Sequence, residues 1–390
     1  MARRIAVVTT SRADYGHLRW ILEGLQAHPG IDLRLIATGA HLAERFGRSV
    51  DEIEADGITV HERLECLLDS DTDLGMAKTI GLATLGLADC LARLRPELLL
   101  LIADRYEMLA PAAVALALRI PIAHIEGGEV SEGAIDEAVR NALTKLAHLH
   151  FTPTELSRRR VLGMGEEPWR VHRVGAPSLD YLRRAELLER DALEAALQWP
   201  LEERVVLVAC HPVTLAESPT GETDALYQAL GALPHQTLFC FPNADMGSRE
   251  LIDRARAFCA RRPAARLFVN LNPVLYWSLL RQVSVLVGNS SSGIMETASL
   301  GLPTVDIGDR QRGRQRPANV LHARPEADEI LDRIAQALDP GFRASLCDLE
   351  NPYGDGRAAE RIVRILASAP LGEVLLRKAP TPPMPEPGDD

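Results

Sequence analysis

Two consecutive series of short apolar segments, each alternating with amphipathic helical patterns, limit most strongly which folds this chain can adopt. Apolar runs without polar alternation are typical of strands that are buried on both faces, as in a parallel sheet covered by helices. We therefore predict an α/β chain with two Rossmann-like, doubly wound domains, whose strand ends can face each other across one cleft. The predicted strands are 5–9, 33–38, 98–102, 121–125, 205–209, 237–241, 267–270, 283–287 and 304–307.

The domain boundary is predicted between residues 175 and 201, where a highly charged helical pattern over 181–197 is followed by Trp199 and Pro200. The end of the chain is rich in Pro and acidic residues, so it is predicted to be an extended, disordered tail without a catalytic role. The predicted parts are 1–174 with the catalytic carboxylates, 175–355 for nucleotide binding, a helix at 356–370 and the tail at 371–390.

Charge and composition argue against several classes of partner. Lys and Arg number 43 against 54 Asp and Glu, a net charge of −11, whereas a nucleic-acid partner needs a basic face. No uninterrupted apolar run reaches the roughly 18 residues that span a membrane. The N-terminal apolar stretch, 5–8, is too short for a signal peptide, so we predict a cytoplasmic protein without a membrane partner. The six cysteines show no Cys-x-x-Cys spacing, which predicts reduced core thiols and neither disulfides nor structural zinc.

Ligands of open parallel sheets bind at the carboxyl ends of the strands, so the loops after the predicted strands should carry the chemistry. The first loop lacks Gly-x-Gly-x-x-Gly, and no Gly-x-x-x-x-Gly-Lys-Ser/Thr occurs, which argues against a nicotinamide enzyme and a P-loop hydrolase. Arg12 in this loop could reach a phosphate or a carboxylate, or be solvated in a helix-capping turn. Asp104 and Arg105 directly follow an apolar strand, where Asp104 is either a catalytic candidate or a helix cap.

The densest group of polar residues follows the fourth predicted strand. Glu126 precedes two glycines, 127–128, which allow the backbone to approach a ligand closely. Asp136 lies in the first turn of the next predicted helix. Carboxylates at a strand end beside glycines suit acid/base catalysis, although Asp136 could instead offset the helix dipole. His124 lies inside the apolar run and is predicted to have a buried structural role.

In the second half, His211 and Asn243 each follow a predicted strand, and His211 could contact a phosphate or a sugar hydroxyl, or be structural. A turn of small residues follows the predicted strand 283–287. Backbone N–H groups at the start of the next helix can bind a diphosphate there. The alternative is a serine-rich helix cap without a ligand. Glu296 in the next turn could hold both hydroxyls of a ribose. Arg310 lies in an arginine-rich loop, either a diphosphate clamp or a solvated basic loop. The small residues considered for binding are Ser290, Ser291 and Gly293.

Taken in order, these loops resemble the hydrolysing UDP-N-acetylglucosamine 2-epimerases, over about residues 4 to 368. One of these motifs alone would be weak evidence for the family, but all of them in the same order along the chain are specific to it. The motifs are Ser11-Arg-Ala-Asp-Tyr15, Thr38-Gly-Ala-His-Leu42, Asp104-Arg-Tyr-Glu107, His124-Ile-Glu-Gly-Gly-Glu-Val130, Ile135-Asp136 with Arg140, Leu143-Thr-Lys-Leu-Ala-His148, His211-Pro-Val-Thr214, Pro242-Asn243, Gly288-Asn-Ser-Ser291 with Gly293 and Glu296, and Arg310-Gln with Gly313-Arg314.

The resemblance implies two Rossmann-like domains of the GT-B kind, with the C-terminal helix crossing back onto the first domain. It implies conversion of UDP-N-acetylglucosamine to N-acetylmannosamine and UDP in nonulosonic (sialic-type) acid biosynthesis, by a homo-oligomer, dimer or tetramer, without cofactor or metal. The implied catalytic carboxylates are Asp104, Glu126 and Asp136. The implied contacts to the UDP sugar are Arg12, Arg105, His211, Asn243, Ser290, Ser291, Gly293, Glu296 and Arg310.

The chemistry of such a reaction explains the demand for carboxylates. The C-2 proton of an N-acetylhexosamine has no adjacent carbonyl to stabilise a carbanion, so direct inversion is prohibitively slow. Loss of the diphosphate from C-1 together with the C-2 proton gives a 2-acetamidoglycal instead. Water then returns to C-1 and a proton to the opposite face of C-2. This scheme needs at least two acid/base groups on different sides of the ring and a cradle for the diphosphate.

Three alternatives remain open at the sequence level. The segment between Glu129 and Asp136 contains Glu132 and Gly133 and is one residue longer than in sialic-acid members of the family. It resembles relatives that process UDP-2,4-diacetamido-2,4,6-trideoxyglucose for legionaminic acid. A GT-B glycosyltransferase is the second alternative, although a transferase needs an acceptor groove more than paired bases, and a nucleotide-sugar sensor is the third. Ala103 stands where the family usually has a glycine.

Overall fold

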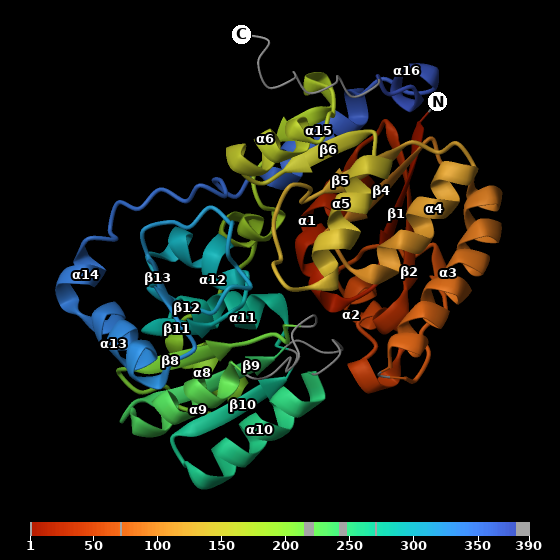
Figure 1. The fold of residues 1–390 in the computed structure, drawn as a ribbon. Coiled ribbons are helices and arrows are strands. Elements are labelled where there is room, and N and C mark those ends of the chain that lie inside the picture. Colours follow the sequence, from red (N-terminus) through yellow and green to blue (C-terminus); the bar gives the residue numbers. More distant parts are fainter. Residues whose placement is uncertain (1, 71, 214–221, 242–247, 270, 380–390) are drawn as a thin grey trace, which may run out of the picture. The chain divides into compact units, whose positions relative to one another are not determined.

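The computed structural model describes residues 2–70, 72–213, 222–241, 248–269 and 271–379, which form two compact units, each built on one sheet (Figure 1). Unit 1 comprises residues 1–129, 138–175 and 359–390, and unit 2 comprises 130–137 and 176–358, within the described ranges. The sequence analysis placed 130–137 in the first domain, whereas their contacts group them with unit 2.

The sheet of unit 1 is parallel throughout, with the strand order β3-β2-β1-β4-β5-β6-β7. The chain leaves β1 in one direction and returns to its other side with β4, so the topological switch lies between these two strands. The strands are β1 (Arg3–Thr9), β2 (Ile31–Thr38), β3 (Glu62–Leu64), β4 (Leu98–Ile102), β5 (Ile122–Ile125), β6 (Leu149–Thr152) and β7 (Val171–Arg173).

Helix α1 of unit 1 begins just after a strand end, where the sequence provides a cap. Ser11 and Asp14 form a reciprocal capping box at the start of α1, which places Arg12 at the first helical position. The helices are α1 (Arg12–Ala27), α2 (Val50–Ala55), α3 (Asp73–Leu94), α4 (Leu109–Ala117), α5 (Ile135–Leu146), α6 (Glu155–Gly163), α15 (Ala358–Ser368) and α16 (Glu373–Leu376), with 3-10 turns η1 (Gly39–Leu42), η2 (Glu44–Phe46), η3 (Tyr106–Met108) and η4 (Pro168–Arg170). In Figure 1, α3 and α4 run side by side, and they pack against each other.

Unit 2 repeats the same doubly wound topology, with the order β10-β9-β8-β11-β12-β13 and parallel pairing throughout. Its strands are β8 (Val205–Ala209), β9 (Gln236–Phe241), β10 (Ala265–Val269), β11 (Val285–Gly288), β12 (Thr304–Ile307) and β13 (Val320–Ala323). Its helices are α7 (Tyr181–Arg184), α8 (Arg190–Leu197), α9 (Thr223–Ala232), α10 (Ser248–Arg261), α11 (Pro273–Leu280), α12 (Ser292–Met295), α13 (Ala327–Leu338) and α14 (Pro340–Ala344), with 3-10 turns η5 (Pro177–Asp180) and η6 (Thr297–Leu300).

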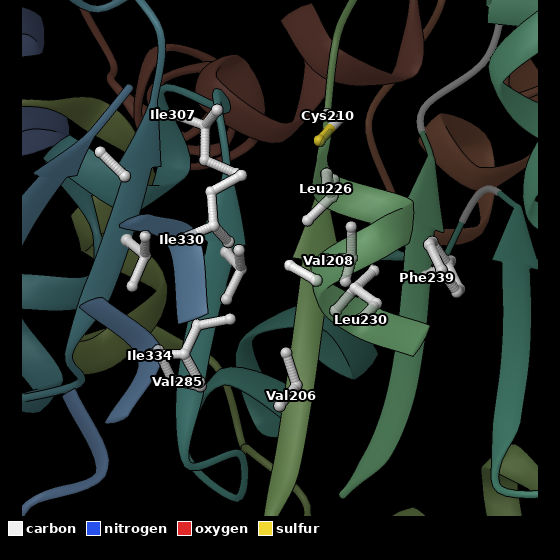
Figure 2. Close-up of a cluster of buried hydrophobic side chains, with 14 of the residues drawn as sticks. Val206, Val208, Cys210, Leu226, Leu230, Phe239, Val285, Ile307, Ile330 and Ile334 are labelled. Atoms are coloured by element: carbon white, nitrogen blue, oxygen red, sulfur yellow. The ribbon is translucent and has the colours of Figure 1, made fainter. Parts of the chain in front are cut away.

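The core of unit 2 shows why uninterrupted apolar runs form these central strands. Figure 2 shows side chains of β8 and β11, such as Val206, Val208 and Val285, packed with Leu230 of α9 and Ile334 of α13. All five are at most 1% exposed. Because helices cover the sheet, its central strands need apolar residues at successive positions, and the predicted fold class of two doubly wound domains is confirmed.

Some predicted elements differ from the structure. Strands β3, β6, β7 and β13 were not predicted, because they are short and contain charged residues or histidines. The predicted charged helix over 181–197 is wrong, since the chain forms α7 and α8 with an interruption at 185–189. At this interruption the amide of Leu188 donates to Oγ of Ser278, 2.9 Å away, so a tertiary hydrogen bond overrides the local helical pattern.

The predicted disordered tail from residue 371 is wrong for residues 371–379. This segment contains α16, whose Leu375 is fully buried. The guanidinium of Arg170, 1% exposed, donates to the carbonyls of Leu375 at 2.7 Å, Arg377 at 2.6 Å and His148 at 3.2 Å. A buried cation that satisfies backbone carbonyls holds the segment against unit 1, which the composition of the tail did not indicate.

Lys378 of the same segment takes part in an acid-sensitive group of charges around Glu166. The Glu166 carboxylate is fully buried and accepts from Lys145 and Lys378 at 2.6 Å and lies 3.1 Å from Nε2 of His150. Burial alone would raise the pKa of Glu166, but the hydrogen bonds from His150, Lys145 and Lys378 outweigh it and lower the pKa from 4.5 to about 2. A depressed carboxyl pKa stabilises the fold above pH 4.5, and this contribution is lost as the pH falls toward 2.

When Glu166 becomes protonated over this pH range, we therefore expect the free energy of unfolding to fall by roughly 3 kcal/mol. Urea unfolding at a series of pH values measures the effect. In Glu166→Gln this part of the pH dependence should be absent. An identical pH dependence of stability in the variant and the parent would contradict the assignment.

One helix among the described residues, α3, is long and apolar enough to cross a membrane by length and composition. Helix α3 is not an uninterrupted apolar run, because it carries widely spaced charges, among them Lys78 and Asp89. Since 33% of its most apolar window is buried, and the core helices of globular proteins satisfy the same criterion, this single helix is weak evidence for a membrane.

Candidate active site

Two strained residues lie side by side at the carboxyl edge of the unit 1 sheet. Ile102 of β4 pairs with Ile125 of β5, and the residues that follow, Ala103 and Glu126, have φ of +58° and +67°. Such left-handed backbone is unfavourable for a residue with a side chain and is concentrated at functional sites. The amide of Ala103 donates to the Ile125 carbonyl at 3.0 Å, so the strained turn is fixed to the neighbouring strand.

Glu126 is paired with His17, a residue that the sequence analysis did not select. Nδ1 of His17, on α1, lies 2.7 Å from Oε1 of Glu126, and their side chains are 27% and 11% exposed. A histidine and a carboxylate at hydrogen-bond distance can pass a proton between them and orient each other. His17 lies in the second turn of the helix that follows β1, so only the three-dimensional fold, not a motif, brings it to Glu126.

Asp104 forms an ion pair and hydrogen bond with Arg140 of α5, whose side chain is 2% exposed. Asp136 lies four residues before Arg140 on the same helix, hence on the same helical face. Asp104 and Glu126 both belong to unit 1 and follow adjacent strands, whereas Asp136 lies in the segment 130–137 that groups with unit 2. The structure therefore brings two of the three predicted carboxylates to one sheet edge within a single unit.

His124 has the buried structural role that the sequence predicted. It is fully buried, and its Nε2 lies 2.8 Å from the carbonyl oxygen of Ala103, to which it donates. Burial lowers the pKa of His124 to about 4, so the ring is neutral near pH 7. Because the carbonyl of Ala103 needs a donor, this neutral ring fixes the backbone that leads directly into Asp104.

The two arginines predicted to bind substrate in unit 1 both have carboxylate partners. Arg12 makes two hydrogen bonds to Glu52 of α2, at 2.9 and 2.7 Å. Arg105 lies 3.0 Å from Glu107, which is 2% exposed. Burial raises the pKa of Glu107, and the charge of Arg105 acts in the opposite direction. An anionic ligand at either arginine would therefore have to share it with, or displace it from, a carboxylate.

The glycines after Glu126 allow close packing of this loop against its neighbours. Gly128 has φ of +79°, and a Cβ there would overlap the carbonyl oxygen of Ser157 on α6. A Cβ on Gly127 would lie 3.0 Å from Oγ1 of Thr144. Close contact between this loop and its neighbouring helices therefore requires both glycines. Glu129 is likewise structural, since its carboxylate accepts from Oγ of Ser157 at 2.7 Å.

In unit 2, His211 and Asn289 meet at the topological switch, after β8 and β11. The backbone amide of His211 donates to Oδ1 of Asn289 at 2.7 Å, and Nδ2 of Asn289 donates to the His211 carbonyl at 2.9 Å. This reciprocal pair joins the two loops at the position where doubly wound sheets bind ligands. His211 therefore lies beside the first residues of the small-residue turn.

The small-residue turn leads into a short helix. Helix α12 has 4 residues and is followed by the 3-10 turn η6, so it lacks the dipole of a long helix. The Gly293 amide donates to the Ser290 carbonyl at 3.1 Å, and a Cβ on Gly293 would lie 2.7 Å from Cγ2 of Thr304, which indicates a packing role. Within the described ranges, no hydrogen bond is seen from the amides of Ser290 and Ser291.

Glu296 ends a chain of hydroxyl groups in unit 2. The Tyr276 hydroxyl donates to Oγ of Ser292 at 2.8 Å, and Oγ of Ser292 donates to the Glu296 carboxylate. Burial, together with the nearby Glu296 charge, raises the pKa of Tyr276 well above its ordinary value, so the phenol stays protonated. Sequence reasoning missed Tyr276, because β11 separates it from the turn that it contacts.

Arg310 lies beside the same turn. Its Nη1 donates to the Asn289 carbonyl at 3.3 Å. Other arginines of the predicted basic clamp have partners inside unit 2, since Arg314 donates to the Val130 carbonyl at 2.7 Å and Arg316 lies 2.7 Å from Asp306. Arg310, Arg314 and Arg316 of the predicted basic loop thus each contact a group of the protein. Asn243, also predicted to bind the ligand, lies outside the described residues.

Each unit thus contains some of the predicted site residues. Unit 1 presents the pairs His17–Glu126 and Arg140–Asp104 at the carboxyl edge of its sheet. Unit 2 presents the Asn289–His211 pair and the serine turn at its own topological switch. No group of three or more His, Cys, Asp or Glu side chains suited to a metal ion occurs in the ranges that the structure describes.

Comparisons with known proteins identify the family of this chain. The family model for UDP-N-acetylglucosamine 2-epimerase matches residues 23–367. A UDP-N,N'-diacetylbacillosamine 2-epimerase (hydrolyzing) from Legionella pneumophila is 36% identical over 97% of this chain and 99% of its own length. A UDP-N-acetylglucosamine 2-epimerase from Neisseria meningitidis is 29% identical over 96% of this chain and 98% of its own.

Solved structures show the same fold. The UDP-GlcNAc 2-epimerase of Methanocaldococcus jannaschii, in complex with UDP-GlcNAc and UDP, superposes with a TM-score of 0.75 at 19% identity, over 93% of this chain and 99% of the other. The match of the family model covers most of the sequence, and the Legionella relative aligns over nearly its whole length. The chain belongs to the UDP-N-acetylglucosamine 2-epimerase family.

Proposed function

We propose that this protein is a hydrolysing 2-epimerase that converts a UDP-linked 2-acetamido sugar and water into UDP and the free sugar inverted at C-2. In the first step the C-1–O bond breaks, the C-2 proton leaves to a base, and UDP departs with the bonding electron pair. In the second step water adds to C-1 of the 2-acetamidoglycal, and an acid delivers a proton to the opposite face of C-2. Atoms and charge balance without an electron donor or acceptor.

The observation that carries this proposal is the pair of carboxylates at the ends of β4 and β5, each with its own partner. Glu126, hydrogen-bonded to His17, accepts or returns a proton at one face of the sugar ring. Asp104, ion-paired with the buried guanidinium of Arg140, transfers the proton of the other step. Asp136 is the third acid/base candidate, one helical turn from Arg140. Two differently supported carboxylates suit a reaction that removes one proton and delivers another.

In unit 2 we assign the diphosphate to the turn that contains Ser290 and Ser291. Backbone amides without a protein partner in the described residues, beside Arg310, are suited to a leaving diphosphate. His211 and Glu296 are assigned to the rest of the nucleotide. Arg12 and Arg105 of unit 1 are also assigned to contacts with the substrate.

Among the two substrates that the sequence analysis considers, we propose UDP-N,N'-diacetylbacillosamine, which is UDP-2,4-diacetamido-2,4,6-trideoxyglucose. The Legionella relative with this activity in its name is 36% identical, against 29% for the Neisseria UDP-N-acetylglucosamine enzyme. The longer segment around Glu132 and Gly133 supports the same choice. The Glu132 amide donates to the Arg310 carbonyl at 3.2 Å, so the extra residue lies against a loop assigned to the substrate.

A parallel assay of UDP-N,N'-diacetylbacillosamine and UDP-N-acetylglucosamine tests the proposal. We expect both UDP and a free manno-configured sugar from the diacetamido substrate without any acceptor, with kcat/KM at least about tenfold higher than for UDP-N-acetylglucosamine, equivalent to 1.4 kcal/mol of transition-state binding. A higher kcat/KM for UDP-N-acetylglucosamine would overturn the substrate assignment alone. Sugar release that depends on an added acceptor would overturn the reaction class.

A further inference from the structure

His17 pairs with Glu126 although the two residues follow strands that are not neighbours in the sheet of unit 1. Strand β4 lies between β1 and β5. His17 lies in the second turn of α1, which the capping box of Ser11 and Asp14 starts directly after β1. Its Nδ1 lies 2.7 Å from Oε1 of Glu126. The fold therefore brings an imidazole from α1 to a carboxylate that the proposed function uses.

The backbone of Glu126 is fixed independently of this pair. Its amide donates to the carbonyl of Phe151 on β6 at 2.8 Å, and its φ of +67° is the left-handed conformation. Such a conformation persists only where the surrounding structure holds it. Because the neighbouring strand already holds the loop at Glu126, the contact with His17 acts on the carboxylate rather than on the backbone.

The imidazole of His17 is more accessible to solvent than the carboxylate that it contacts. The side chain of His17 is 27% exposed and that of Glu126 is 11% exposed. Three other histidines of unit 1, His41, His124 and His150, are fully buried. An imidazole that contacts both a carboxyl group and water can move protons between the two. Of these four histidines, His17 combines solvent exposure with a contact to a carboxylate of the proposed site.

Inversion at C-2 creates a need for such a group. One proton leaves C-2 on one face of the ring and another arrives on the opposite face, so two different groups carry the two transfers. After one turnover the base holds one proton more than before, and the acid holds one proton fewer. Both groups have to exchange a proton with solvent, directly or through a neighbour, before the next turnover.

We propose that His17 exchanges a proton between Glu126 and solvent once in every turnover. The inference rests on the proposed function, in which Glu126 takes or gives a proton at C-2. After Glu126 has taken a proton, the O–H bond at Oε1 breaks, its electron pair stays on the carboxylate, and Nδ1 of the neutral ring binds the proton. The imidazolium then loses a proton to water. After Glu126 has given a proton, the same steps run in reverse, so His17 acts through Glu126 rather than on the sugar.

Pre-steady-state release of UDP by the full chain tests the proposal. His17→Gln keeps a hydrogen-bond donor for Glu126 but cannot accept a proton from it. We expect a first turnover within about threefold of the parental rate and then a steady-state kcat about a hundredfold lower, because resetting Glu126 becomes the slow step. The affinity for UDP should stay within about twofold. His28→Gln, at the other end of α1, is the matched control and should behave like the parent in both phases.

Chemical rescue tests whether the group that His17 supplies is a base. We expect added imidazole to raise the steady-state kcat of His17→Ala at least about tenfold. Pyrazole, a ring of the same size that is a much weaker base, should not restore kcat. Circular dichroism verifies that each variant is folded.

Three results would overturn the inference. Equal slowing of the first and later turnovers in His17→Gln would show that the histidine only orients Glu126. Equal rescue by imidazole and pyrazole would show that the ring only fills space, and a parental steady-state kcat in His17→Gln would show that Glu126 is reset without it. Failure of the proposed function is distinguishable, since the parent itself would then release no UDP, or a sugar that keeps its original C-2 hydrogen.

Discussion

Replacement of Glu126 by glutamine is expected to reduce kcat by about a thousandfold, which is the usual loss when a general acid or base is removed. Glutamine has the same shape and can keep a hydrogen bond to His17, but it cannot accept a proton. Since the residues assigned to the nucleotide in unit 2 are untouched, the affinity for UDP should stay within about twofold, a difference of less than 0.5 kcal/mol. Release of UDP measures kcat, and isothermal titration with UDP measures affinity.

Glu129→Gln is the matched control for this variant. Glu129 lies three residues later in the same loop and is 3% exposed, and it accepts from the Ser157 hydroxyl. We expect Glu129→Gln to lower stability while kcat falls by less than about tenfold. Equal losses of kcat in both variants would show that Glu126 acts through the loop structure. Parental activity in Glu126→Gln would remove it from the mechanism.

Replacement of Gly288 by alanine is expected to destabilise unit 2 by roughly 3 kcal/mol or more and to abolish UDP binding. Gly288 has φ of +142°, which only glycine adopts readily, and a Cβ there would overlap the Ala209 carbonyl at the end of β8. The backbone must move apart at the point where Asn289 and His211 join the two loops. Urea unfolding and UDP titration measure the two effects.

Gly231→Ala provides the matched control. Gly231 lies in α9 of the same unit, and a Cβ there would meet nothing within 4 Å. We expect this substitution to raise stability by about 0.5–1 kcal/mol, because alanine favours the helix, and to leave UDP binding unchanged. If both glycine variants retain UDP affinity and stability alike, the close approach of β8 and β11 is not what shapes the nucleotide site.

The central strands of both sheets could be predicted because each is a run of apolar residues between turns. Strand β4 is fully buried at every position, so composition alone marks it. Short strands such as β7, with His172 and Arg173, carry no comparable signal, because an edge strand tolerates polar residues. The carboxyl-end rule also predicted where Asp104, Glu126, His211 and the serine turn lie, since it follows from topology rather than from side-chain detail.

The partners of these residues could not be predicted. The contacts of Glu126 with His17 and of Asp104 with Arg140 join residues far apart in sequence, and no local pattern encodes such pairs. The glycines after Glu126 have the composition of a ligand loop, yet Gly128 is required by the Ser157 carbonyl. Similarly, the arginines around Arg310 suggest a clamp, but partner groups such as Asp306 become visible only in the folded chain.

The central claim is that the C-2 proton is removed and replaced in the course of hydrolysis. Proton NMR of the reaction in deuterated water tests it most directly. We predict that every molecule of free sugar carries deuterium at C-2 and has the inverted configuration there, with UDP as the other product. A free sugar that keeps its original C-2 hydrogen and configuration would show simple hydrolysis and contradict the account.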